Sequence, residues 1–256
     1  MRIKARGKTQ VWNRRLSHAA PGRNGAQPIS KVDPFGFLVL IMNESTPFFS
    51  MKVPYASAAS QEQISEHYRQ ILKARRDTLL TALERLPHGR DPYDLEIGCG
   101  HGHFLADYAA AHPERHCLGI DIAGGRLARA RRKTDRAGLD NVSWIQAEAQ
   151  LFLECVAEAI RFSRVFILFP DPWPKKRHHK HRLVQVRFLD LLAEVCAPDA
   201  ALYFRSDHFP YVDQAREAIQ ASRMWQLRPK KTWPWEQPSV FQNLATGYRS
   251  LAAVRR

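Results

Sequence analysis

Apolar positions change their spacing along the chain, and this change separates helix-like from strand-like segments. From Gln61 to Leu86 they recur at steps of three and four residues, which predicts one long amphipathic helix that ends before Pro87. Beyond it, short apolar runs alternate with helix-length segments. The predicted strands are 93–97, 117–122, 142–147, 164–169 and 200–205, with two more near 225–230 and 248–254. The predicted helices are 103–112, 124–138, 150–161, 183–196 and 210–222.

This alternation of strands and helices is typical of parallel βαβ units. Because the strands are nearly continuous apolar runs, we expect helices to cover both faces of their sheet. The sequence therefore predicts an α/β fold of the Rossmann-like class, with a mostly parallel seven-stranded sheet and helices on both faces.

Residues 1–55 do not share the alternating pattern. They contain nine Lys and Arg residues against two acids, Asp33 and Glu44, and several turn-forming pairs with proline or glycine. We predict that this basic extension is mostly unstructured and that the folded domain covers 56–256. Three interpretations of the extension are open: an RNA-binding arm, an acid-poor targeting segment, or sequence upstream of a true start at Met42 or Met51.

The composition adds charge to this picture. The 256 residues include 39 Lys and Arg against 25 Asp and Glu, and the resulting charge of +14 favours a polyanionic partner, nucleic acid before an anionic membrane. The longest apolar run, Phe35–Met42, is too short to cross a bilayer, so no membrane partner is predicted. The four cysteines form no CxxC pair, which disfavours a zinc site and fits the reducing cytoplasm.

A glycine-rich loop follows the first strand of the predicted sheet. Gly98, Gly100 and Gly102 come directly after this strand, but His103 stands where a dinucleotide fingerprint requires its third glycine. The spacing instead resembles the GxGxG loop of class I S-adenosylmethionine-dependent methyltransferases, in which glycines let the methionine part of the cofactor pass close to the backbone. Glu96, at the strand end, is then placed to attract the ammonium group of the cofactor.

Two further acids follow the next two strands. Asp121 comes 25 residues after Glu96 and ends a second apolar strand, where a carboxylate can accept hydrogen bonds from two ribose hydroxyls. Glu148 follows the third strand and can reach an adenine amino group, although an acid at such a position is often a helix cap. Together they predict a site for an adenosine-bearing cofactor.

The loop after the fourth strand carries the most specific motif of the chain. Residues 169–178 read FPDPWPKKRH and resemble the FPDPWxKxRH motif of the bacterial tRNA (guanine-N7-)-methyltransferase family. The resemblance continues through 181–183 and 203–207 and, with LEIGCGxGxF at 95–104, covers roughly residues 56–256. It implies a class I methyltransferase fold, S-adenosylmethionine as the cofactor, and methylation of guanine N7 in tRNA, at position 46 of the variable loop.

The resemblance also implies roles for single residues. Guanine N7 carries a lone pair and no proton, so the enzyme needs no base; it must align N7 with the methyl group and support the positive charge that develops on the purine. Asp171, held between two prolines, is implied as the catalytic residue and as a neighbour of the cofactor. The implied substrate-binding residues are Lys175, Asp207, Thr246 and Arg249.

Basic residues beside this loop are the predicted RNA contacts. Residues 175–187 hold six Lys and Arg and no acid, and 126–136 hold six against Asp135, so both segments can bind tRNA phosphates; a solvated basic face is the other interpretation. The predicted RNA-contacting residues are Arg177, His178, His179, Lys180, His181 and Arg182. Adjacent histidines without a nearby carboxylate or thiol predict no metal site. The sequence leaves a monomer and a homodimer open.

Three positions depart from the family pattern. Asp121 stands where Glu is usual and Glu148 where Asp is usual, which keeps the charge. The family's C-terminal TxxE motif reads TGYR at 246–249, which reverses the charge at Arg249. Two alternatives therefore stay open: a divergent paralogue that acts on another RNA base or is inactive, and a basic RNA-binding protein that uses the fold as a scaffold. We expect the aromatic residues nearby to pack in the core or a lid rather than stack on a base: Trp225, Trp233, Trp235 and Phe241.

Overall fold

The structure is a computed structural model of the chain. It describes residues 29–32, 38–41, 58–87, 92–156, 160–230, 232–236 and 247–256. The chain divides into two compact units, Met1–Arg69 and Gln70–Arg256, and helix α1 (Ala58–Glu84) runs across the division.

The first unit contains a pair of short strands that the sequence pattern did not predict. Strand β1 (Ile29–Val32) pairs antiparallel with β2 (Leu38–Ile41), with Ile29 opposite Ile41. Residues 1–55 were expected to be mostly unstructured, and all described residues of that segment belong to these two strands. The rest of the segment lies outside the described residues.

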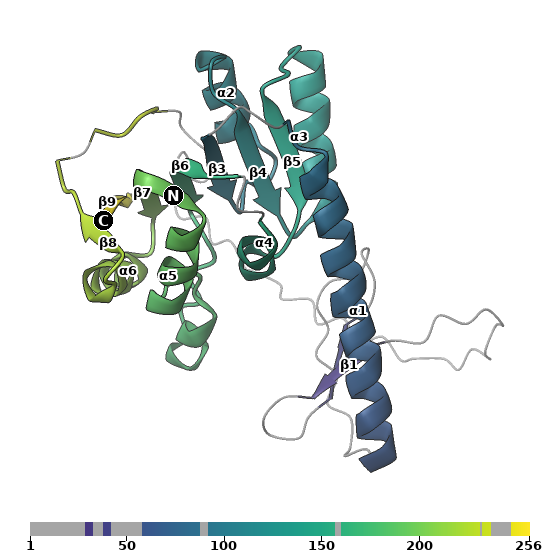
Figure 1. The fold of residues 1–256 in the computed structure, drawn as a ribbon. Coiled ribbons are helices and arrows are strands. Elements are labelled where there is room, and N and C mark those ends of the chain that lie inside the picture. Colours follow the sequence, from purple (N-terminus) through teal and green to yellow (C-terminus); the bar gives the residue numbers. More distant parts are fainter. Residues whose placement is uncertain are drawn as a thin grey trace, which may run out of the picture. The chain divides into compact units, whose positions relative to one another are not determined.

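A seven-stranded sheet forms the centre of the second unit (Figure 1). Its strands are β3 (Tyr93–Ile97), β4 (Cys117–Asp121), β5 (Val142–Gln146), β6 (Phe162–Leu168), β7 (Cys196–Ser206), β8 (Trp225–Leu227) and β9 (Arg249–Arg255). They lie in the order β5-β4-β3-β6-β7-β9-β8. Neighbours from β5 to β7 are parallel, and β9 runs antiparallel to β7 and β8. The predicted α/β fold with a mostly parallel seven-stranded sheet is confirmed.

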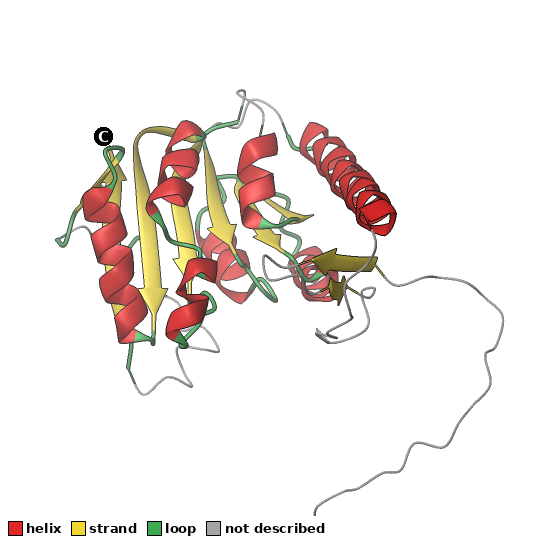
Figure 2. Cartoon of the chain, turned by 90° about the horizontal axis from the view of Figure 1, so that it is seen from below, coloured by secondary structure: helices red, strands yellow, loops and turns green. Residues whose placement is uncertain are grey.

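Helices cover both faces of this sheet, as the apolar strands predicted (Figure 2). The helices of the second unit after α1 are α2 (His103–Ala111), α3 (Gly124–Arg136), α4 (Ala149–Cys155), α5 (Val186–Glu194) and α6 (Phe209–Ala221). The end of α1 packs with α4, α5 and α6 on the face that carries Leu95 and Ile120. Helices α2 and α3 pack on the other face, against Phe166 and Trp144. Alternate residues of each strand therefore belong to separate cores.

Several element ends differ from the prediction. Helix α4 stops at Cys155, because Val156 has an extended backbone, whereas the pattern predicted a helix to residue 161. Strand β7 begins at Cys196, four residues before the predicted start. A 3-10 helix, η1 (Lys176–His181), lies in the loop after β6 and was not predicted.

One aromatic ring fixes the glycine loop against the sheet. A Cβ at Gly119 of β4 would lie 2.4 Å from the Trp144 ring, and a Cβ at Gly102 would lie equally close to it. Both positions therefore have room only for glycine. The Trp144 indole N–H donates to Thr134 Oγ1 at 3.3 Å, so the ring is also held from α3.

A buried charge network anchors the opposite end of β3. Asp94 is fully buried, and its carboxylate accepts hydrogen bonds from Tyr108 at 2.6 Å, Ser163 at 2.8 Å and Arg115 Nη2 at 2.7 Å. Arg164 Nη1 lies 3.6 Å from the same carboxylate. The buried charge is thus paired and hydrogen-bonded, as burial of a carboxylate requires. These contacts tie α2, β3 and β6 together.

The packing of Trp144 on β4 gives a stability prediction. We expect Gly119→Ala to lower the free energy of unfolding by roughly 1–3 kcal/mol, because the added methyl overlaps the Trp144 ring in a packed core. The matched control is Gly125→Ala in α3, where a Cβ meets no atom within 4 Å. This control is expected to be neutral or to stabilise by up to about 1 kcal/mol. Urea unfolding of the two variants measures the difference, and equal midpoints would contradict the packing argument.

Candidate active site at the carboxyl edge of the sheet

The predicted site residues follow the ends of neighbouring parallel strands. Because these strands run in one direction, their carboxyl ends meet at one edge of the sheet, which is where open α/β sheets bind ligands. Residues that end or directly follow successive strands are Glu96 (β3), Asp121 (β4), Glu148 (β5), Asp171 (β6) and Asp207 (β7). The topology therefore brings together the acids that the sequence singled out.

Hydrogen bonds hold the first residues of the loop after β3 on β4, and two of its glycines border open space. The N–H groups of Gly98 and Cys99 donate to the Ile120 carbonyl at 2.8 and 3.0 Å. Gly98 and Gly100 have φ values of +77° and +56°, which favour glycine. A Cβ at either glycine would meet no atom of the described residues within 4 Å. This part of the loop thus leaves room for a ligand to approach the backbone.

Asp121 connects the glycine loop to the end of β4. Its carboxylate accepts the N–H of Gly100 at 2.9 Å and the N–H of Ala123 at 2.8 Å. Arg126 Nη1 lies 3.8 Å from the same carboxylate. Each carboxylate oxygen retains a further lone pair, so the group can also accept ligand hydroxyls, as the prediction requires.

Glu96 is a buried carboxyl group with an unsatisfied oxygen. The residue is 4% exposed, and its Oε2 has no hydrogen-bond partner among the described residues. Burial raises the pKa of Glu96 from 4.5 to about 8, and a hydrogen bond from the Leu105 N–H opposes this shift. Buried polar atoms are nearly always paired, so an orphaned acceptor beside an open loop marks a place for a ligand that donates hydrogen bonds. A cationic amine fits this requirement.

Glu148 acts as a helix cap. Its two carboxylate oxygens accept the N–H groups of Gln150 at 3.1 Å and Leu151 at 2.9 Å, at the first turn of α4. This is the alternative role that the strand-end position allowed. The predicted contact with adenine stays a prediction.

The loop after β6 has an unusual backbone. Phe169 and Trp173 have φ values of +50° and +43°, which non-glycine residues rarely adopt. The Phe169 N–H donates to the Arg205 carbonyl at 2.8 Å, which holds the start of the loop on β7. Strain of this kind persists only where the surrounding structure enforces it, and it clusters at functional sites. Asp171 is exposed between the two strained residues.

Arg182 was predicted to contact RNA, but its side chain is buried in the structure. It is 2% exposed, and its guanidinium donates to the Pro172 carbonyl at 2.8 Å and to Gln214 Oε1 at 2.6 Å. It also lies 5.0 Å above the Tyr211 ring. A guanidinium used in this way is not available to a phosphate. Arg182 instead holds the loop that presents Asp171.

The other basic residues of this segment lie on η1 or at its start. Lys175, Arg177, Lys180 and His181 are exposed, and His178 and His179 are partly buried. The rings of His178 and His181 lie 5.8 and 5.1 Å from the Trp173 ring. The exposed cations are therefore free to meet a polyanion beside Asp171.

A buried arginine organises the C-terminal side of the edge. Arg205 is 4% exposed and lies 4.1 Å from the Trp233 ring and 4.7 Å from the Tyr248 ring. Its guanidinium donates to Glu236 at 3.0 and 3.2 Å and to Ser250 at 3.0 Å. The sequence motif includes Arg205 but does not indicate this role, because the partners are distant along the chain.

The remaining predicted residues at this side are placed as follows. Asp207 is exposed at the end of β7. Arg249 is half exposed, lies 4.3 Å from the Phe209 ring, and its Nη1 is 3.8 Å from Asp213 Oδ1. Thr246 and Phe241 lie outside the described residues. The packing expected of the tryptophans is observed: Trp225 is fully buried, and Trp233 and Trp235 pack against the α2–α3 core.

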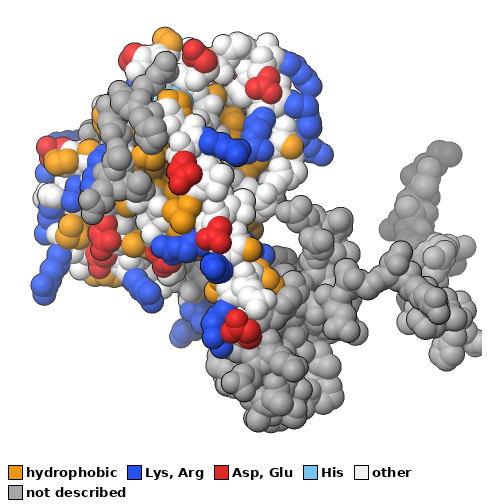
Figure 3. Space-filling model, turned by 45° about the vertical axis from the view of Figure 1, so that its right-hand side comes forward, with side chains coloured by type: hydrophobic (Ala, Val, Ile, Leu, Met, Phe, Trp, Pro, Cys, Tyr) orange, Lys and Arg blue, Asp and Glu red, His pale blue; other side chains and the backbone are white. Residues whose placement is uncertain are grey.

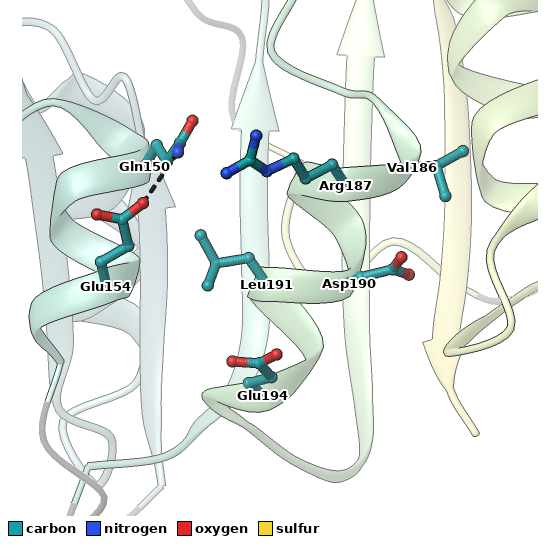
Figure 4. Close-up of a pocket in the computed structure, with 7 residues that line it drawn as sticks. All are labelled: Gln150, Glu154, Val186, Arg187, Asp190, Leu191 and Glu194. Atoms are coloured by element: carbon teal, nitrogen blue, oxygen red, sulfur yellow. Dashed lines mark hydrogen bonds between the residues drawn. The ribbon is translucent and has the colours of Figure 1, made fainter.

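Other features of the described residues lie apart from this edge. A groove between α4 and α5 contains none of the predicted site residues (Figure 4); its lining is Gln150, Glu154, Val186, Arg187, Asp190, Leu191 and Glu194. The described residues include no group of three or more His, Cys, Asp or Glu side chains that could hold a metal ion. No described helix is both long and apolar enough to span a membrane.

Comparison with known proteins gives a family match over the part of the chain that contains these site residues. A family model described as "Putative methyltransferase" matches residues 90–253. The curated tRNA (guanine-N(7)-)-methyltransferase of Halorhodospira halophila is 38% identical over 130 residues, which cover 51% of this chain and 56% of that protein. The protein of the same name from Syntrophotalea carbinolica is 42% identical over 122 residues, 48% of this chain and 53% of that protein. The chain spans about half the length of the curated relatives it matches.

A solved structure has the same fold at low identity. The crystal structure of NSun6 from Pyrococcus horikoshii with SFG is 16% identical, with a TM-score of 0.50, and the match covers 71% of this chain and 51% of that chain. At this identity the likeness concerns the fold alone.

The buried carboxyl group of Glu96 gives a pH-dependent prediction. Its pKa of about 8 in the folded protein, against 4.5, means that the folded chain binds a proton that the unfolded chain releases. The stability from this proton is complete below pH 4.5 and is lost as the pH rises to about 8. Glu96→Gln has no carboxyl proton at this position, so it cannot lose this stability as the pH rises. We expect the free energy of unfolding of the variant to rise relative to the wild type by up to about 5 kcal/mol over this range, since each pH unit contributes about 1.4 kcal/mol.

Urea unfolding of the ligand-free protein at several pH values measures this difference. Glu194→Gln, on the exposed end of α5, is the control and should show no pH-dependent gain. A Glu96→Gln difference that stays constant with pH would mean that the carboxyl group is ionised in the folded protein, contrary to the expectation.

Proposed function

The chain belongs to this family of methyltransferases, and from that premise we propose that it transfers a methyl group from S-adenosylmethionine to N7 of a guanine in tRNA. One observation carries the proposal: the open glycine loop, with the unsatisfied Glu96 beside it, and the FPDPWPKKRH loop follow adjacent strands at one edge of the sheet. A methyl donor and a base can therefore meet there. The names of the curated relatives support the same reaction.

The residues around the glycine loop fit the proposed cofactor. S-adenosylmethionine supplies an activated methyl group on a sulfonium, together with an ammonium and a ribose that need partners. Glu96 Oε2 is the unpaired acceptor suited to the ammonium, and a bound cation lowers the pKa that burial has raised. Asp121 has lone pairs for ribose hydroxyls. The space at Gly98 and Gly100 admits the chain that joins these groups.

Asp171 is the proposed catalytic residue because the reaction needs a fixed negative charge beside the purine. The N7 lone pair forms the new N–C bond while the methyl–sulfur bond breaks, and the departing sulfur keeps that electron pair. The purine thereby gains a positive charge. A carboxylate that accepts hydrogen bonds from the guanine N1–H and amino group both orients the base and stabilises this charge. The strained loop and the Arg182 contact keep Asp171 in position.

The tRNA itself is proposed to lie along the basic residues beside this loop. Lys175 and Arg177 are exposed cations next to Asp171, and phosphate contacts from such residues give affinity and position without reading bases. Asp207, Thr246 and Arg249 are proposed further substrate contacts. Position 46 of the variable loop is the proposed target, and a cytoplasmic localisation stays a prediction.

The direct test is nucleoside analysis of bulk tRNA after incubation with labelled S-adenosylmethionine. We expect N7-methylguanosine from the wild type and a loss of roughly 100-fold or more in rate for Asp171→Asn, which removes the charge but keeps the size. Asp140→Asn, an exposed acid before β5 at the opposite end of the strands, is the control and should retain full activity.

Each alternative gives its own result in that experiment. Label in a different nucleoside indicates a divergent paralogue with another target base. Cofactor binding without any transfer indicates an inactive paralogue, and tRNA binding without cofactor binding indicates an RNA-binding protein on a methyltransferase scaffold. Any of the three would reject the proposed reaction.

The basic loop gives a second prediction, on tRNA affinity. The double variant Lys175→Ala with Arg177→Ala should bind tRNA more weakly and reduce the slope of log Kd against log salt by about 2, one for each lost phosphate contact. Arg223→Ala is the control, because Arg223 is exposed before β8, away from the carboxyl edge. Titration of labelled tRNA at several salt concentrations measures both. A slope equal to that of the wild type would remove this loop from the RNA path.

A further inference from the structure

Four basic side chains form a separate pocket on the α2–α3 side of the unit. His101, His103, Arg129 and Lys133 line a depression of about 340 Å³ between the glycine loop, the start of α2 and the middle of α3. This volume is about ten times the share of one water molecule in the liquid, about 30 Å³, so a phosphate group has room there. Lys and Arg side chains also gather on the upper part of the face drawn in Figure 3. The proposed reaction uses none of the four residues.

The four side chains are arranged as two pairs, each of a cation and an imidazole. Lys133 Nζ donates to His103 Nδ1, and Arg129 Nη1 donates to His101 Nε2 at 3.4 Å. The two imidazole rings lie 6.1 Å apart. Within the described part of the chain, neither Arg129 nor Lys133 forms an ion pair with a carboxylate. The two cations are therefore available to an anion, although the carboxylate of Asp107 acts on the neighbouring His103.

The placement of the four residues favours an anion over a solvated basic face. Arg129 and Lys133 are four residues apart on α3, so they project on one side of that helix. His103 begins α2, where the positive end of the helix dipole adds to the field. The pKa of His103 is lowered, first by partial burial and then by the charge of Lys133, and the carboxylate of Asp107 opposes this shift. The carboxylate of Asp107 offsets part of this positive field at His103, but Arg129 and Lys133 still repel each other, and a bound anion relieves that repulsion.

The two histidines lie within the glycine-loop motif. In the LEIGCGxGxF pattern of residues 95–104, His101 and His103 stand at the two variable positions. The glycines and Glu96 account for the cofactor part of that motif. The histidines are thus not needed for the cofactor part of the loop, and a second ligand group beside the cofactor edge gives them a role.

We propose that His101, His103, Arg129 and Lys133 form a phosphate-binding pocket that holds one backbone phosphate of the RNA substrate, on the opposite side of the glycine loop from the Lys175–Arg177 segment. This role rests on the proposed function for the identity of the RNA. Two anchored points on either side of the cofactor edge fix the orientation of a duplex, which a single basic loop cannot do. The pocket therefore acts on substrate affinity and not on the chemical step.

The test compares two double variants of the same helix. Arg129→Ala with Lys133→Ala removes the pocket cations, and Arg132→Ala with Arg136→Ala removes the same charge from residues of α3 outside the pocket. We expect the pocket variant to raise the Kd for tRNA roughly tenfold at low salt and to reduce the salt slope by about 1, the value for one phosphate. The control variant should change the Kd for tRNA and the salt slope by less. A His101→Gln, His103→Gln variant should weaken tRNA binding in the same direction while both helix cations remain.

Binding is measured without turnover, so this test does not depend on the reaction. In methyl transfer, the pocket variant should raise KM for tRNA and leave kcat and the Kd of S-adenosylmethionine unchanged. An equal effect of the two α3 variants would mean diffuse attraction and overturn the pocket. A changed Kd for S-adenosylmethionine would mean that the four residues support the cofactor loop instead. Micromolar binding of inorganic phosphate that is lost in the pocket variant would assign the site to a free phosphate compound, and a wild type that binds no tRNA would also reject the proposal.

Discussion

The parallel pairing of β3 between β4 and β6 is the constraint on which the site depends. A strand paired in parallel on both sides requires a crossover to each neighbour, so every such strand ends at the same edge. The chain continues from β3 outward to β4 and β5, then returns to β6 on the other side. Loops after β3 and β6 therefore diverge at the point where the strand order reverses, which leaves the crevice that ligands use in open α/β sheets. The glycine loop and the FPDPWPKKRH loop lie on either side of that point.

Two buried acids on one strand, β3, fit different roles, one in stability and the other at the site. Asp94 and Glu96 are two residues apart, so they project from one face of the strand, and both are nearly inaccessible. Asp94 is satisfied by Arg115, Tyr108 and Ser163, so it holds the sheet and α2 together. Glu96 has an oxygen with no partner in the described residues and a raised pKa, so its burial costs stability. A cost retained at the ligand edge is understandable if a bound cation offsets it.

The sequence predicted what periodicity and short motifs encode, and missed what distant contacts decide. The strands of the sheet and the acids at their ends followed from apolar runs and from the residues after them. Arg182 was predicted to contact RNA but is buried, and nothing in a run of basic residues distinguishes the one whose partner, Gln214, lies 32 positions away. The requirement for glycine at position 119 was invisible for the same reason, since it comes from a ring on the neighbouring strand. The capping role of Glu148 is local, because its partners lie two and three residues away, so the sequence offered it as an alternative.

The reversed charge at Arg249 is the departure from the family pattern that suggested a divergent function. The structure shows which residues surround it. Arg249 is half exposed and lies near Asp213, so the substitution buries no unpaired charge. The buried cation on this side of the edge is Arg205, whose carboxylate partner is Glu236 and whose guanidinium is enclosed by Trp233 and Tyr248. The Arg205 side chain is 5% exposed and that of Glu236 is 58% exposed, so a damaging change here would be one that leaves the buried Arg205 without its partner. The altered motif therefore leaves the Arg205–Glu236 pair intact, and we expect its effect at the exposed end of β9, where Arg249 lies.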